Sequence, residues 1–382
     1  MKLTSHLLLV LVGSTVIVVP ASAQVPDLLN ALDAGGRAMG MGGANNATNV
    51  DTLATYYNPA ALAYLDTKEV GLVYRNLPES STRLSGSRAN PNESSDGESG
   101  GRTISHAGFA APVRELFGRG SGTIGFSYTL GGFIDDEARA ASLSDDPLTL
   151  VNYRLRRKAR SAFYSVSYGK AVNSGLSYGL GLVLASQQID YSESASAFDG
   201  NTQIPFGNTG ESSTGTGLGV IGGLLYTPAA SPRWTLGLSL RSPIELSGNG
   251  STSSDYDTIP GRGILGATYR VEGFRDGKDY VLLGGQLQQF FGGDSSALFD
   301  RNSQTVFGLG AEYNVGIEQG RIPLRVGFAT VNDGGNGFSS RNSFTFGFGL
   351  RPNQIPLGLD VSYAVPQNGG YDFSISASYR FK

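Results

Sequence analysis

The sequence predicts an all-β protein: a transmembrane antiparallel β-barrel of about 14 strands, with an N-terminal plug of short helices and loops. Three observations predict this fold. Glycine is abundant, with 55 among 382 residues, and only 16% of the residues are charged, against about 25% in an ordinary globular domain. From residue 67 onward, apolar residues alternate with small or polar ones. After the first 23 residues no apolar run reaches the ~18 residues of a membrane-spanning helix, so only closed strands remain for crossing a bilayer.

Composition excludes several classes of function. The chain has no cysteine, which excludes disulfide scaffolds, thiolate metal sites and cysteine nucleophiles. Its formal net charge of −3 offers no attractive field for a nucleic acid. No phosphate-binding loop and no paired-histidine metal site is present. We therefore expect no cofactor, no metal ion and no nucleic-acid partner.

Residues 1–23 have the three parts of a secretory signal peptide. Lys2 is followed by an apolar run from Leu7 to Val19 and then by small residues up to Ala23. The apolar run is shorter than the ~20 residues that a retained membrane helix needs. We expect cleavage after Ala23, so that the folded chain starts at residue 24.

Residues 24–65 form the predicted plug, and their first part carries helix signals. Pro26 suits the first turn of a short helix over residues 26–32. Gly35 and Gly36 are expected to stop this helix.

The second part of the plug carries two further start signals. Asp51 is suited to cap a helix over residues 52–57, and Asn58 to cap a turn that has Pro59 in its first position. About 40 residues are too few to bury a core of their own. This segment must therefore lie against a larger unit, the predicted barrel of residues 66–382.

The barrel prediction rests on strands with a period of two. In residues 344–351 the apolar Phe and Leu side chains alternate with Thr, Gly and Arg, and residues 371–382 repeat the pattern. One face of each strand is therefore apolar and the other small or polar. A secreted propeller or sandwich is the alternative, but a glycine and serine face is too small to pack a dry core. The expected strands lie near residues 67–76, 102–112, 120–131, 160–171, 175–190, 216–228, 232–247, 259–271, 278–291, 302–315, 321–331, 342–351, 356–365 and 371–382.

The connections support a membrane barrel, because such barrels have short periplasmic turns and longer outer loops. Residues 76–101, 132–159, 191–215 and 247–258 are long and polar, and we expect them to be outer loops. The stretches at 171–174, 228–231 and 272–277 are short.

A family resemblance is visible at Gly35–Leu65, which reads GGRAMGMGGANNATNVDTLATYYNPAALAYL. The GMGGA and NPAAL elements, in that order after a signal peptide, resemble the N-terminal signature of the FadL-like outer-membrane superfamily. This superfamily includes hydrophobic-compound transporters and the PorV/PorQ and TraF-like proteins. The resemblance implies a fourteen-stranded barrel whose lumen is plugged by this segment. It marks as plug residues Gly40, Gly42, Gly43, Asn58, Pro59 and Ala60.

The resemblance also implies a location and two candidate functions. The location is the bacterial outer membrane, where the partners are lipid, lipopolysaccharide and the barrel assembly machinery. The first function is passive transport of a hydrophobic small molecule across that membrane. The alternative is a PorV-like scaffold that holds an exported protein and transports nothing.

Two groups of barrel residues are candidates for specific roles. Charged residues on the small or polar faces of their strands are expected to point into the lumen: Arg75, Arg241, Arg325, Arg351 and Asp360. At the C-terminus, Tyr379 and Phe381 resemble the aromatic-ended final strand by which outer-membrane barrels are recognised for assembly. Lys382 departs from the usual terminal aromatic residue.

An enzyme is not expected. Gly175–Gly179 reads GLSYG and fits the pattern of a nucleophile elbow, but that motif needs a following helix and a histidine partner. No helix is predicted there. His106 is the only histidine of the mature chain, and we interpret it as a strand residue.

Two charged stretches lie in the expected outer loop of residues 132–159. The basic stretch could contact lipopolysaccharide phosphates, or its charges could simply be solvated. The acidic stretch could bind a divalent cation, but pairing with the nearby arginines is the simpler interpretation. The basic residues are Arg154, Arg156, Arg157, Lys158 and Arg160; the acidic ones are Asp135, Asp136, Glu137, Asp145 and Asp146.

Overall fold

The computed structural model describes residues 35–48, 50–85, 94–114, 121–145, 148–199, 202–249, 258–292, 304–332, 340–367 and 372–381. The expected signal peptide and the helix expected at residues 26–32 lie outside these ranges.

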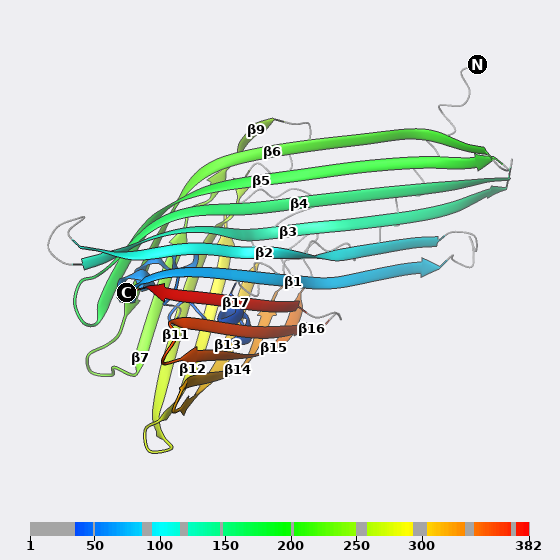
Figure 1. Cartoon of the computed structure of the whole chain (residues 1–382). Helices are drawn as coiled ribbons and strands as arrows, with labels where there is room; N and C mark the ends of the chain where they lie inside the picture. Colours follow the sequence, from blue (N-terminus) through cyan, green and yellow to red (C-terminus); the bar gives the residue numbers. More distant parts are fainter. Residues whose placement is uncertain are drawn as a thin grey trace.

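Fourteen antiparallel strands form one closed barrel, as the sequence predicts (Figure 1). Each strand pairs with its neighbour along the chain, and the first strand pairs with the last, from Lys68 opposite Phe381 to Asn76 opposite Phe373. The propeller and sandwich alternatives are thereby excluded. The strands of the barrel are β1 (Lys68–Ser85), β2 (Ser94–Arg114), β3 (Ser121–Asp145), β4 (Leu148–Ala171), β5 (Leu176–Asp199), β6 (Thr202–Tyr226), β7 (Trp234–Arg241), β11 (Gly261–Phe274), β12 (Asp279–Phe291), β13 (Thr305–Ile317), β14 (Gly320–Val331), β15 (Arg341–Pro352), β16 (Leu357–Pro366) and β17 (Asp372–Phe381).

The outward face of the barrel is apolar, and β5 shows why the chain folds this way. Leu182 and Leu184 are 54% and 47% exposed, whereas Val183 and Ala185, which alternate with them, are 1% and 0% exposed. Alternate side chains of a strand point to opposite faces, so the exposed leucines form an outward row. In water, a continuous apolar surface of this kind would be strongly unfavourable. It is the surface that a hydrocarbon layer covers.

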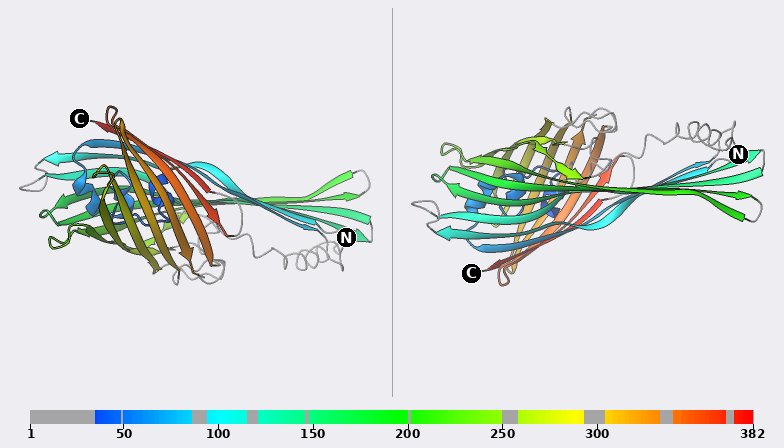
Figure 2. Two further views of the ribbon diagram at one scale, coloured as in Figure 1. Left: turned by 90° about the horizontal axis from the view of Figure 1, so that it is seen from below. Right: turned by 90° about the horizontal axis from the view of Figure 1, so that it is seen from above.

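Strands β1–β6 continue far beyond the rest of the barrel, and here the sequence-based expectation was wrong. Residues 76–101, 132–159 and 191–215 were expected to be outer loops, but most of them are strand (Figures 1 and 2). Together they form a twisted ribbon that projects from one end of the barrel. Polar composition is typical of loops, yet cross-strand pairs of opposite charge and of Ser and Thr also stabilise solvent-exposed strands.

The ribbon defines the orientation of the barrel. The connections at its opposite end are short, such as those between β13 and β14 and between β15 and β16. Membrane barrels have their short turns on the periplasmic side. The start of β1 and the end of β17 lie on this periplasmic side, and the ribbon projects outward.

The connection between β7 and β11 folds back over the inside of β6. It includes three short strands: β8 (Ile244–Glu245), β9 (Ser247–Asn249) and β10 (Thr258–Ile259). Ile244 is fully buried, and its side chain lies against Gly219 of β6. The strand expected near residues 232–247 therefore ends at Arg241, and Ile244 after it fills part of the lumen.

Residues 35–65, which we call the luminal segment, lie inside the barrel (Figure 1). They include three short helices, α3 (Gly36–Gly40), α4 (Ala54–Tyr57) and the 3₁₀ helix η2 (Pro59–Tyr64). Helix α3 begins at Gly36, and the helix that Gly35 and Gly36 were expected to stop lies outside the described residues. Among the described residues, no helix combines the length and the apolar character that crossing a bilayer requires.

The luminal segment touches opposite sides of the wall with its two ends. Helix α3 lies against β14–β17, and η2 lies against β3–β6. An apolar cluster surrounds α4 and includes Tyr56, Phe163 and Ile244. A second apolar cluster surrounds η2 and includes Leu62 and Leu225. The core of this protein is therefore the contact between the luminal segment and the inner face of the wall.

Candidate functional site

Gly42 and Gly43 bring the luminal segment into backbone contact with the wall. Their φ angles of 63° and 86° lie in the left-handed region, which glycine adopts without strain. A Cβ at Gly42 would lie 2.5 Å from the carbonyl oxygen of Phe328 and 2.6 Å from that of Leu309. Only a glycine fits between these two strands.

Gly40 lies two residues before Gly42 and contacts the same part of the wall. Its carbonyl oxygen accepts a hydrogen bond from Thr345 Oγ1 at 3.2 Å, and Thr345 Oγ1 accepts one from the backbone N of Gly42 at 3.1 Å. Thr345 thus satisfies two polar groups of a segment that has no sheet partner.

Asn58 caps η2 and ties it to the opposite wall. Its Oδ1 accepts from the backbone N of Ala60 at 3.1 Å. Its Nδ2 donates to the carbonyl oxygens of Asn46 and Leu224. Pro59 is the first residue of η2, where its missing N–H costs nothing.

The wall makes room for this turn with glycines. A Cβ at Gly179 would lie 2.2 Å from the carbonyl carbon of Pro59, and one at Gly223 would lie 2.0 Å from Asn58 Oδ1. The small inward positions of β5 and β6 are therefore filled by the backbone of the luminal segment.

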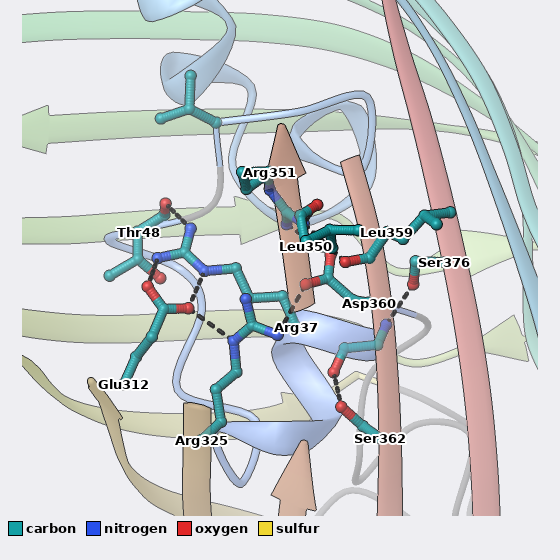
Figure 3. A network of polar contacts seen from close by, with 12 residues as sticks. Arg37, Thr48, Glu312, Arg325, Leu350, Arg351, Leu359, Asp360, Ser362 and Ser376 are labelled. Carbon is teal, nitrogen blue, oxygen red and sulfur yellow. Dashed lines mark hydrogen bonds and ion pairs between the residues drawn. The ribbon is translucent and has the colours of Figure 1, made fainter. Parts of the chain in front are cut away.

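On the other side of the lumen, five charged residues form an alternating chain (Figure 3). Arg37 of α3 donates to both oxygens of Glu312, at 2.9 and 3.1 Å. Glu312 also accepts from Arg325 at 2.6 Å. Arg325 donates to Asp360 at 2.7 Å, and Asp360 accepts from Arg351 at 2.6 Å.

This chain, which we call the ion network, contains one residue of the luminal segment and four of the wall. Glu312, Arg325 and Asp360 are almost fully buried. Removing one partner from a buried pair leaves an uncompensated charge and costs about 3–5 kcal/mol. The network therefore holds α3 at a defined position, because Arg37 is the partner that leaves if α3 moves.

Further contacts fix Arg37 itself. Its Nη1 donates to the carbonyl oxygen of Thr48 at 2.7 Å. Burial alone would lower the pKa of its guanidinium, but the Glu312 carboxylate raises that pKa above the ordinary value. The first residue of α3 is also anchored, since Gly36 N donates to Ser376 Oγ at 2.6 Å and Gly36 O accepts from Ser362 Oγ at 2.5 Å (Figure 3).

Two neighbouring carboxyl groups, those of Glu69 and Asp51, lie where the middle of the luminal segment meets β1. Glu69 accepts from the backbone N of Thr52 at 3.2 Å and from Arg380 of β17 at 2.8 Å. Asp51 accepts from the backbone N of Leu53 at 2.8 Å. Burial and the neighbouring Glu69 carboxylate raise the pKa of Asp51 to about 7.

A polar cavity of about 300 Å³ lies between the luminal segment and the periplasmic part of the wall. Its lining mixes arginines, among them Arg321, Arg351 and Arg380, with carboxylates, among them Asp51 and Glu69. A surface of this kind holds water and charge and offers little to an apolar molecule. Within the ranges that the structure describes, no three histidine, aspartate or glutamate side chains gather closely enough to hold a metal ion.

A buried aromatic cluster packs around α4 inside the barrel. Tyr56 lies with its ring centroid 5.5 Å from that of Phe163, and 4.8 Å from that of Tyr57. Arg262 caps the pair, with Cζ 4.2 Å from the Tyr56 ring centroid. Arg241 lies 4.5 Å from the Phe163 ring centroid. Cations over aromatic faces are attracted to them, so these arginines complete an apolar cluster.

The structure places all five expected lumen charges inside the barrel, but they do not form one group. Arg325, Arg351 and Asp360 belong to the ion network. Arg241 donates to the carbonyl oxygen of Pro260 at 2.8 Å. Arg75 is fully buried and pairs with Asp372 of β17, with Nε 3.0 Å from Oδ1.

Sequence reasoning missed several of the residues that make this site. Glu312 and Arg262 alternate with outward-facing residues of their strands. The period-two pattern that identified Arg241 could therefore have identified them as well. Arg37 carries no such signal, because it stands in a short glycine-flanked helix without periodicity. Its partner becomes apparent only when α3 and β13 meet.

The wall itself is irregular beside the aromatic cluster. The β2–β3 ladder pairs residues 94–99 with 136–141 and resumes at His106 opposite Thr129. Between these stretches the described residues 100–105 and 130–135 carry no β2–β3 pair. Both strands also shift register against their other neighbours here.

The apolar cluster reaches this interruption. A Cβ at Gly131 of β3 would lie 2.0 Å from the Phe163 ring, so the ring packs on the backbone of the interrupted stretch. On β2, Ile104 is 48% exposed on the outer surface. An apolar lumen and an apolar outer surface thus meet where the β2–β3 ladder is broken.

The motif with an enzymatic pattern does not have the geometry of a nucleophile elbow. Leu176 starts β5, and therefore Ser177 lies in a strand, where its Oγ donates to the carbonyl oxygen of Ala60 at 3.0 Å. His106 contacts the hydroxyl oxygens of Thr52 and Thr129, at 3.0 and 2.8 Å. Both side chains are engaged in holding the luminal segment and its neighbours.

The residues expected to guide assembly lie at the periplasmic end of β17. Tyr379 and Phe381 are both exposed on the outer surface, with ring centroids 5.0 Å apart. They stand opposite Val70 and Lys68 of β1, at the seam where the first and last strands close the barrel.

No protein-family model and no curated protein matches the sequence. Solved structures do match over almost the whole chain. A FadL homologue of Pseudomonas aeruginosa is 16% identical with a TM-score of 0.58, covering 91% of this chain and 98% of that one. The Pseudomonas putida toluene transporter TodX is 12% identical with a TM-score of 0.60, covering 92% and 99%. The Ralstonia pickettii toluene transporter TbuX is 14% identical with a TM-score of 0.54, covering 93% and 100%.

The fold is that of a FadL-like barrel. At these identities the likeness establishes architecture and not cargo. With its apolar outer face, the FadL-like barrel is a multi-pass outer-membrane protein. A further similar structure is named as the monoaromatic hydrocarbon channel CymD.

Proposed function

We propose that this FadL-like barrel is a passive channel for hydrophobic small molecules, with the luminal segment acting as its plug. The observation that carries the proposal is the break in the β2–β3 ladder beside the aromatic cluster around Tyr56 and Phe163. A hydrophobic molecule that enters from the outer face meets an apolar surface there. The broken ladder offers it a lateral exit through the wall.

The polar groups on the periplasmic side of the lumen also favour a lateral exit through the wall over passage straight through the barrel. The apolar cluster adjoins the charged cavity, which Leu53 and Val73 of the cluster also line. Moving an apolar molecule through a polar, hydrated space forfeits the transfer free energy that apolar contact provides. Leaving through the wall into hydrocarbon keeps that free energy. No residue needs to react, since the cargo moves down its concentration gradient.

The similar structures suggest the class of cargo. Two of them are named toluene transporters, and another is a monoaromatic hydrocarbon channel. A monoaromatic hydrocarbon is therefore the first probe to use. Cells that display the barrel in their outer membrane should take up labelled toluene faster than cells without it. Equal uptake at equal barrel abundance would refute the transport proposal.

The plug role has its own test. Deleting residues 24–63 should raise the permeability of barrel-containing liposomes to a hydrophobic probe and also to small polar solutes, because the lumen is then open. The deletion variant must still show the heat-dependent gel mobility of a folded barrel. Unchanged flux through a folded deletion variant would refute the plug role.

The PorV-like scaffold remains the competing function. It would use the outer ribbon to hold an exported protein. A pull-down of the tagged barrel that returns one secreted protein in stoichiometric amount, together with absent toluene uptake, would favour the scaffold over the channel.

A further inference from the structure

The polar cavity of about 300 Å³ lies between two parts of the molecule that no sheet joins. One side consists of residues 37 and 48–53 of the luminal segment, and the other consists of inward residues of the wall, chiefly of β1 and β12–β17. The cavity therefore has this shape only while the luminal segment is seated. Its volume corresponds to about ten water molecules at ~30 Å³ each, which suits a small ligand.

The lining of the cavity carries more basic than acidic residues, with five arginines and four carboxyl groups. Arg321 is the one of these arginines that has no carboxylate partner in the part of the chain that the structure describes. Burial and Glu69 raise the pKa of Asp51 to about 7, so this carboxyl group is only partly ionised near neutral pH. The cavity therefore carries positive charge that its own acidic residues do not balance. The pairs that the other arginines form are Arg37 and Arg325 with Glu312, Arg325 and Arg351 with Asp360, and Arg380 with Glu69.

Arg321 and Arg351 stand directly opposite one another on β14 and β15. Both side chains line the cavity. Like charges opposite one another across a ladder are unfavourable. The Arg351 side chain is 35% exposed and Arg321 is exposed as well, so solutes from the periplasm can reach both guanidinium groups.

Tyr280 of β12 holds the Arg321 side chain at the cavity. The Cζ atom of Arg321 lies 5.1 Å from the centroid of the Tyr280 ring, and Arg321 Nη1 donates to the carbonyl oxygen of Lys278 at 3.4 Å. Arg270 contacts the same ring, with Cζ 4.1 Å from its centroid, but Arg270 also forms an ion pair with Glu272 at 2.7 Å. Of the two cations that contact this ring, Arg321 is therefore the one whose charge is available to a ligand.

The chemistry at this end of the cavity suits an oxyanion. A guanidinium group presents paired N–H donors that match the oxygen atoms of a carboxylate or a phosphate. A concave basic surface also raises the local concentration of anions. An apolar cargo gains nothing from these groups, so this ligand is distinct from the transported molecule.

We propose that the cavity binds a small oxyanion, a carboxylate or a phosphate, between Arg321 and Arg351, and that the bound anion holds the luminal segment in its seated position. A ligand that binds only one of two states shifts the equilibrium towards that state, and the cavity is complete only in the seated state. The effect on the luminal segment rests on the plug role proposed above, whereas the binding itself does not.

Calorimetric titration tests the binding. Folded barrel in detergent and a chloride buffer is titrated in separate experiments with citrate and with inorganic phosphate, and sodium chloride of equal ionic strength is the blank. At least one of the two anions should bind saturably, with one site per barrel, and the tighter of the two identifies the chemical class. If neither anion binds saturably, the proposal is wrong.

Variants of Arg321 place the site. Arg321→Gln should lower the affinity about tenfold or more, as expected for the loss of charge-assisted hydrogen bonds. Arg321→Lys keeps the charge but not the planar fork and should recover part of the affinity. The matched control is Arg233→Gln, because Arg233 is an exposed residue of the short turn before β7 and does not line the cavity; it should bind like the unmodified protein. Unchanged affinity in a folded Arg321→Gln barrel would overturn the proposed site.

Amide hydrogen exchange tests the effect on the luminal segment. At an anion concentration 100 times the dissociation constant, exchange over residues 36–48 should slow by about 100-fold, and Arg321→Gln should abolish this slowing. Saturable binding without slower exchange would contradict the holding role. Neither measurement uses toluene, so a barrel that binds the anion but does not transport toluene contradicts the proposed function and leaves this inference standing.

Discussion

The luminal segment is attached to the two sides of the lumen by different forces. Against β13–β17, α3 is held by Arg37 and by single hydrogen bonds to the side chains of Thr345, Ser362 and Ser376. Against β3–β7, α4 and η2 are held by close packing on glycines and by apolar clusters.

This difference indicates which end of the luminal segment can be released from the wall when solution conditions change. Ion pairs weaken when one partner changes its charge, and they are lost together because each member of the network depends on its neighbours. Close packing against backbone does not depend on the charge of a side chain in this way. We therefore expect the α3 side to be the end that is released, and the η2 side to act as the anchor.

The largest effect is expected at the centre of the ion network. Glu312→Gln leaves Arg37 and Arg325 without their shared carboxylate, and the seated position of α3 should weaken by about 3–5 kcal/mol. Amide hydrogen exchange over residues 36–48 should accelerate, while exchange over residues 58–64 stays slow.

The matched control is Glu318→Gln. Glu318 is exposed and lies just beyond β13, outside the network. It should leave exchange in both regions unchanged. Equal acceleration of both ends in Glu312→Gln would contradict the division into a releasable and an anchored side.

The anchored side is tested by adding a methyl group at a wall glycine. Gly223→Ala places a Cβ 2.0 Å from Asn58 Oδ1, and overpacking of this kind costs about 1–3 kcal/mol. Gly222→Ala is the neighbouring control, since its Cβ would meet only Leu180 at 3.6 Å. Thermal unfolding should separate the two variants, and identical melting temperatures would show that η2 is not tightly packed.

The cap of η2 should have a smaller effect. Asn58→Ala removes the acceptor for the backbone N of Ala60, and loss of such a cap costs about 1 kcal/mol. Asn58→Ser keeps an acceptor oxygen and should recover part of that loss. If the serine variant is no more stable than the alanine variant in thermal unfolding, the cap does not contribute as proposed.

The seating of the luminal segment should also depend on pH. The pKa of Asp51 is raised from 3.8 to about 7, so the seated segment binds a proton that a released, solvated Asp51 would give up. Seating is therefore favoured as pH falls from about 7 towards 4 and weakens as pH rises through 7. Leakage of a small polar solute from liposomes should increase between pH 5 and pH 8, and Asp51→Asn should remove this dependence. A leak that falls with rising pH would contradict the assignment.

How much the sequence predicts depends on the kind of signal. The strand count and the closed barrel follow from alternation, because one side of each strand meets hydrocarbon. The ribbon was missed, because residues 132–159 and 191–215 are rich in charged residues, serine and glycine, a composition typical of loops, although Val151, Tyr153 and Leu155 do alternate with polar residues. The position of α3 was also missed, because a helix that begins at Gly36 is stabilised by Ser362 and Ser376, which lie more than three hundred residues away.

The site follows the same rule. Arg325 and Asp360 stand at inward positions of regular strands, where alternation alone selects them. The ion pair between Arg37 and Glu312 links α3 to both of them. It has no local sequence signal, because its two residues lie 275 positions apart in the chain. Sequence patterns indicate which face a residue occupies, and only the closed barrel determines what it meets there.

The most direct test of the proposed route is a disulfide that locks the plug to the wall. The chain has no cysteine, and a Cβ at Gly71 would lie 3.4 Å from Thr52 Cβ, close to the ~3.5–4.5 Å of a disulfide. In the variant Thr52→Cys, Gly71→Cys, uptake of labelled toluene should be the same before and after oxidation, because the cargo leaves through the wall. If oxidation stops uptake and reduction restores it, the plug must move for transport and the lateral route is wrong.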